Sequence, residues 1–66
     1  MATHEEIEAA KTLAVATLRE LENSDDAEEA HGTADTVLLT LLRTMGAGEV
    51  SDAFIETRDK RGFWYS

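Results

Sequence analysis

Residues 24–46 read SDDAEEAHGTADTVLLTLLRTMG and contain a long helical pattern of apolar residues. Apolar side chains recur there at intervals of three and four residues, which places them on one face of an α-helix. Ser24 can cap the amino end, the acidic residues of the first turns suit the positive end of the helix dipole, and Gly46 stands where a left-handed residue would end the helix. The stretch therefore predicts a helix over about residues 25–45. Its apolar members are Ala27, Ala30, Ala34, Val37, Leu38, Leu41, Leu42 and Met45.

Gly32 is the weak point of this predicted helix, because an interior glycine costs about 0.5–1 kcal/mol relative to alanine. The helix can bend there and restart with Thr33 as a new cap, or it can run through. We predict that it runs through.

Two further helices are predicted on either side of this stretch. Thr3 and Glu6 have the spacing of a capping box, which starts a helix over about residues 4–22. After Ala47-Gly48, the apolar pattern indicates a short helix over about residues 49–57. The predicted fold is all-α, with residues 1–66 forming one domain: a hairpin of two long helices plus a short third helix.

Self-association is expected from the size of the chain and from the width of its apolar stripes. A core built from 66 residues leaves little net stability. Both long helices are apolar over more surface than one neighbouring helix can cover. We therefore expect a homo-oligomer, either a dimeric or a larger helical bundle.

The amino-acid composition excludes some kinds of site and disfavours some kinds of partner. The chain has no cysteine, which rules out disulfides and a Cys-ligated zinc site, and its formal net charge of −8 disfavours duplex nucleic acid as a partner. Its apolar runs are far shorter than a membrane span, and its amino end lacks the pattern of a signal peptide. We therefore expect a cytoplasmic protein with no membrane partner.

The positive charge is concentrated at the carboxyl end. Residues 1–57 have a net charge of −10, whereas residues 58–66 have a net charge of +2 and end in adjacent aromatic residues. One interpretation is that the aromatic side chains fold back over the open end of the hairpin. The other is a ligand site in which the cations contact phosphates and an aromatic ring stacks on a base. Its residues would be Arg58, Lys60, Arg61, Trp64 and Tyr65.

Two acidic features also have alternative interpretations. One helix face holds Glu28, His31 and Asp35, which could bind a metal or orient a general base. We predict instead a structural role for them, with no metal, no cofactor and no catalytic residue.

The acidic residues of the first two predicted helices form either a solvated surface or a surface that docks a basic partner. That surface would comprise Glu5, Glu6, Glu8, Glu20, Glu22, Asp25, Asp26, Glu28 and Glu29, around the first interhelix turn and its neighbouring faces.

About the last 40 residues resemble a group of small uncharacterised phage and prophage proteins. The shared pattern is a His-x-x-Ala-Asp helix (His31 to Asp35), leucines at helical spacing, a glycine, a short amphipathic helix and a terminal Trp-Tyr (Trp64 and Tyr65). The chain departs from it in a longer Arg-Asp-Lys-Arg-Gly segment and in a final serine. The resemblance implies a phage-type accessory protein in the host cytosol. It adds His31 and Asp35 to the ligand-binding residues.

The leading functional hypothesis is a non-enzymatic, oligomeric protein that sequesters a nucleotide immune signal through its basic and aromatic carboxyl end. Hydrolase, kinase, phosphate-loop and nucleophile-elbow motifs are not found in the sequence, which disfavours an enzyme. The alternative is an acidic protein that inhibits a host defence protein. A second alternative is a structural helical dimer with neither role.

Overall fold

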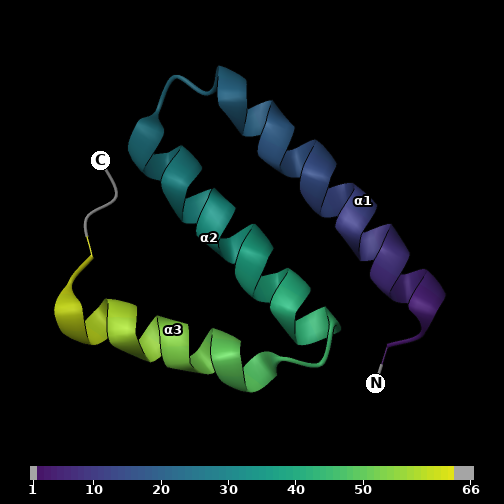
Figure 1. The fold of residues 1–66 in the computed structure, drawn as a ribbon. Helices are drawn as coiled ribbons and strands as arrows, with labels where there is room; N and C mark the ends of the chain where they lie inside the picture. The colour runs from purple at the N-terminus through teal and green to yellow at the C-terminus, as the bar shows by residue number, and fades with distance from the viewer. Residues whose placement is uncertain (1, 64–66) are drawn as a thin grey trace.

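The computed structural model describes residues 2–63, and this part of the chain consists of helices and short connections, with no strand (Figure 1). The elements are α1 (His4–Glu20), a 3₁₀ turn η1 (Leu21–Asn23), α2 (Ala27–Thr44) and α3 (Gly48–Arg61). The predicted all-α fold, a hairpin plus a third helix, is confirmed. None of the helices in residues 2–63 has the length and apolar character needed to cross a membrane.

Helix α1 begins at the predicted capping box. The Thr3 hydroxyl oxygen accepts a hydrogen bond from the Glu6 backbone N–H at 3.1 Å, and the Glu6 carboxylate accepts one from the Thr3 backbone N–H at 3.4 Å. Two backbone donors that the helix leaves unpaired are thereby satisfied. The helix ends at Glu20 in the turn η1, slightly before the predicted end.

Helix α2 is capped by Asp26, not by Ser24 as predicted. The Asp26 carboxylate accepts a hydrogen bond from the Glu29 backbone N–H at 3.0 Å, whereas the Ser24 hydroxyl accepts one from the Asp26 backbone N–H at 3.2 Å. The serine thus shapes the connection that leads into the cap. The helix runs through Gly32 without a break and is followed by Gly46 at φ 86°, both as predicted.

Helix α3 is longer than the sequence pattern predicted. It continues four residues past Thr57, to Arg61, and stops at Gly62, whose φ of 68° lies in the left-handed region. Such a residue commonly ends a helix, because only glycine adopts this conformation without strain. Residues 58–61 therefore belong to α3 and are not part of a separate tail.

The three helices lie in one layer, in which α3 diverges at an angle from the carboxyl end of α2 (Figure 1). Helix α2 is in the middle, with α1 antiparallel to it on one side and α3 on the other (Figure 1). The Cα atoms fill 35 × 30 × 8 Å, so the layer is one helix thick. Among the described residues, the buried side chains are Ala14 between α1 and α2, Leu39, and Ser51 in α3.

Candidate functional site

The basic residues of the predicted ligand site lie together in the last turn of α3. Lys60 Nζ is 2.7 Å from Glu56 Oε1, and Arg58 Nε is 3.5 Å from Asp59 Oδ1. Arg61 is exposed and forms no ion pair within residues 2–63. Cations in a last turn also stabilise the negative end of the helix dipole. Arg61 is thus an exposed cation that no carboxylate within residues 2–63 neutralises.

The turn after α3 brings an aromatic side chain back onto the helix. The Gly62 and Phe63 backbone N–H groups both donate to the Arg58 carbonyl oxygen, at 2.8 and 3.4 Å. The ring of Phe63 then meets that of Phe54 edge to face, with centroids 6.2 Å apart and an interplanar angle of 60°. Aromatic pairs prefer this geometry. The Phe63 ring therefore folds back onto its own helix, α3, which by itself does not test a plug over the open end of the hairpin. Trp64 and Tyr65 lie outside the described residues.

His31 and Asp35 approach each other on α2, one turn apart. His31 Nε2 is 3.7 Å from Asp35 Oδ1, and the Asp35 side chain is only 12% exposed. Glu28, the third member of the predicted cluster, is exposed on the first turn of the same helix. Within residues 2–63, no group of three or more His, Asp and Glu side chains is placed to hold a metal ion.

A groove between α2 and α3 includes one residue of the predicted site, Asp35. It has a volume of about 200 Å³ and is lined by Asp35, Leu38, Leu39, Leu42, Val50 and Phe54. Asp35 therefore shares a groove with Phe54, whose ring contacts Phe63, and Arg58 lies one helical turn beyond Phe54. The walls are almost wholly apolar, with one carboxylate at the rim. Sequence reasoning missed this groove, although the spacing of Val50 and Phe54 already placed them on one helix face.

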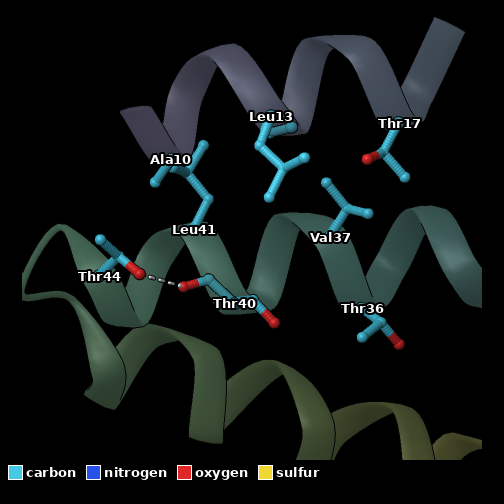
Figure 2. A pocket seen from close by; sticks show the side chains of 9 residues that line it. Ala10, Leu13, Thr17, Thr36, Val37, Thr40, Leu41 and Thr44 are labelled. Carbon is cyan, nitrogen blue, oxygen red and sulfur yellow. Dashed lines mark hydrogen bonds between the residues drawn. The ribbon is translucent and has the colours of Figure 1, made fainter. Parts of the chain in front are cut away.

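A second groove, of about 190 Å³, runs between α1 and α2. Figure 2 shows Leu13 reaching into it from α1, with Val37 and Leu41 reaching in from α2. Thr36, Thr40 and Thr44 follow its other edge, and the Thr44 hydroxyl is turned back to the Thr40 carbonyl oxygen at 3.1 Å. No charged residue lines this groove, so it offers no cation to an anionic ligand.

The acidic residues gather at one corner of the layer. Residues 20–29, around the α1–α2 connection, contain six carboxylates and no base, and all six side chains are exposed. Glu5, Glu6 and Glu8 lie toward the other end of α1, roughly 18–22 Å from Glu20 at 1.5 Å per residue. The nine acidic residues named from the sequence therefore do not form one surface. The corner consists of Glu20, Glu22, Asp25, Asp26, Glu28 and Glu29.

Comparison of the chain with protein-family models, with curated proteins and with solved structures finds no match.

Proposed function

We propose that this chain is a non-enzymatic accessory protein of the phage type, which works in the host cytosol by sequestering a small nucleotide signal. Its ligand contacts would be the basic end of α3, the adjoining aromatic residues and the rim of the α2–α3 groove. The observation that carries the proposal is the position of Arg61, an exposed cation without an ion pair in the described part of the chain. In the chain it lies two residues before Phe63, whose ring meets that of Phe54.

The charge distribution supports an anionic ligand at this place. A chain of net charge −8 repels anions over most of its surface, so a phosphate is attracted only where cations are concentrated. Half of the six Lys and Arg residues stand in the last turn of α3. The Lys60–Glu56 pair is exposed and therefore weak, because exposed ion pairs contribute about 0–1 kcal/mol. A phosphate can displace such a carboxylate.

Aromatic side chains beside the cations supply the second contact. Stacking of a base on an aromatic ring contributes about 1–3 kcal/mol in single-strand sites. Trp64 and Tyr65 are proposed for this role on the basis of the sequence. Phe63 already packs against Phe54, which leaves the residues after it as the stacking candidates. His31 and Asp35 are proposed as contacts to the polar edge of the base or to the ribose.

The test is isothermal titration calorimetry against cyclic dinucleotides, cyclic trinucleotides and ADP-ribose, with two matched arginine variants. Arg61→Ala should weaken binding and reduce its salt dependence, since one phosphate contact is lost. Arg19→Ala removes the other exposed arginine without an ion pair in residues 2–63, on α1, and should leave binding unchanged. An equal loss in both variants, or no binding by the unchanged protein, would contradict the proposal.

The acidic corner favours a second candidate function, inhibition of a host defence protein that has a basic groove. Six exposed carboxylates within ten residues form a compact negative surface that can imitate phosphates. A plaque assay in a host that carries the defence system separates the two candidates. Loss of protection in the Glu28→Gln, Glu29→Gln double variant but not in Arg61→Ala would favour the acidic inhibitor. The reverse result would favour nucleotide sequestration.

A further inference from the structure

The molecule lacks the second layer that a stable domain needs. The Cα atoms of one helix lie on a cylinder of radius about 2.3 Å, so a thickness of 8 Å leaves room for one layer of helices. Domains bury their apolar faces between at least two layers. Within the described residues, Ala14 and Leu39 are the only apolar side chains that are buried, and each keeps a small exposed fraction. One copy of the chain therefore exposes both broad faces of its layer.

The two broad faces of α2 carry different side chains. Residues two apart on an α-helix point about 200° apart, so Leu38 and Thr40 project from opposite sides of the layer. Thr36, Thr40 and Thr44 edge the groove between α1 and α2, whereas Leu38 and Leu42 line the groove between α2 and α3. The two grooves thus open on opposite faces. One face is rich in threonine and the other in leucine.

The large exposed apolar side chains concentrate on the leucine side. Met45 is seven residues after Leu38 and returns to nearly the same direction, since seven residues complete about two turns. Val50 and Phe54 line the groove beside Leu38. On α1, Val15 points about 200° away from Leu13, which lines the groove on the threonine side. We call this surface the apolar face; it consists of Val15, Leu38, Leu42, Met45, Val50 and Phe54.

We propose that a second copy of this chain docks on the apolar face, so that two layers pack face to face around a twofold axis. The exposed area fits this arrangement. The chain exposes 5081 Å², about 900 Å² more than the roughly 4,200 Å² that a compact protein of its mass exposes. A standard interface buries about 800 Å² per partner. One face-to-face contact removes the excess and supplies the core that each layer lacks.

A second copy fits this face better than a membrane does. An apolar helical surface that lies on a bilayer is normally bordered by Lys and Arg, which attract anionic lipids. This chain has six bases against 14 acids, and its acidic corner would repel such a surface. A twofold dimer instead packs an apolar patch against the same patch of the other copy, so that each apolar face covers the other. Asp35, the one carboxylate that lines the groove, already has His31 Nε2 3.7 Å away within the same copy.

The test uses sedimentation equilibrium with one leucine variant on each face. Leu38 is 52% exposed and Leu13 is 68% exposed, so neither change removes a buried side chain from a single copy. The unchanged protein should sediment as a dimer at micromolar concentration. Leu38→Glu should raise the dissociation constant roughly 100-fold or more, because each dimer contains the buried charge twice. Leu13→Glu should leave the dissociation constant within a few-fold of the original.

Cross-linking provides the readout that does not depend on the stability of the glutamate variant. The chain has no cysteine, so Leu38→Cys and Leu13→Cys each introduce a single reactive thiol. A short bismaleimide should link Leu38→Cys into a covalent dimer and leave Leu13→Cys unlinked. Preferential linkage of Leu13→Cys would assign the interface to the threonine side. A folded 7.3 kDa monomer, or a monomer that binds anionic vesicles through Leu38, would overturn the proposal.

Discussion

Arg43 and Asp52 form an ion pair that joins the last turn of α2 to the second turn of α3. The Lys11–Glu8 and Lys60–Glu56 pairs, by contrast, each lie within a single helix. The Arg43 side chain also passes within 3.8 Å of the position where a Cβ on Gly48 would stand. The arginine thus spans the connection between the two helices and contributes to the angle at which α3 leaves α2.

Arg43→Ala should lower the free energy of unfolding only modestly, by about 0.2–1 kcal/mol, because both members of the pair are exposed and solvent screens their attraction. A double-mutant cycle with Asp52→Ala, followed by urea unfolding at one fixed protein concentration, measures the coupling. Arg19→Ala is the control. A coupling of zero would mean that the pair does not hold the two helices together.

Gly32 and Gly62 should respond to alanine with opposite signs. A Cβ at either position meets no atom within 4 Å, so packing does not distinguish them. Gly32 lies inside α2, where alanine is favoured by about 0.5–1 kcal/mol, whereas Gly62 has a φ of 68°, where a Cβ costs roughly 1–2 kcal/mol. Thermal unfolding of both variants checks this. A destabilised Gly32→Ala would indicate that α2 needs to bend.

Thr3→Ala should destabilise the protein by about 1 kcal/mol, because it removes the hydroxyl that caps α1. Thr12→Ala is the matched control. The Thr12 hydroxyl donates to the Glu8 carbonyl oxygen inside the helix, a contact that does not cap the helix, and alanine has the higher helix propensity. Circular dichroism during urea unfolding gives both values. If the two variants lose equal stability, the capping box is not what stabilises the start of α1.

Ser51→Ala should raise the free energy of unfolding by roughly 1 kcal/mol. The Ser51 hydroxyl is fully buried and has no hydrogen-bond partner among residues 2–63, so the folded protein bears its desolvation cost without a compensating bond there. Ser51→Val fills more volume at the same place and should destabilise the protein by about 1–3 kcal/mol through overpacking. Chemical unfolding of both variants separates the two effects. A loss of stability in Ser51→Ala would reveal that the hydroxyl is bonded in solution.

The local features of the fold could be predicted from the sequence because they depend on neighbouring residues. The Thr3–Glu6 box and the end of α2 before Gly46 follow from capping rules alone. The cap of α2 was misassigned because Ser24 and Asp26 are both good capping residues and only the turn geometry chooses between them. The length of α3 was underestimated because the apolar pattern ends before the helix does, at Thr57, although Gly62 was the available stop signal.

The arrangement of the helices and the candidate site were harder to predict from the sequence. Helical periodicity identifies the apolar residues of α2 but not the angle at which α3 joins it. The two separate faces of the layer and the groove that Asp35 and Phe54 line could therefore not be predicted from the pattern. The contact of His31 with Asp35 did follow from their spacing on one helix face. Trp64 and Tyr65, on which the predicted ligand site most depends, fall outside the described residues, and their role stays a prediction.

The single-layer arrangement also has a kinetic consequence. Helix α2 packs against α1 and α3, which are its neighbours in the chain, so the main tertiary pairings close short loops. Proteins with such low contact order fold within microseconds to milliseconds, whereas association of two folded copies is a second-order step whose rate falls on dilution. Refolding at decreasing protein concentration should therefore leave a fast helical phase unchanged and slow only the later phase, in which two layers meet.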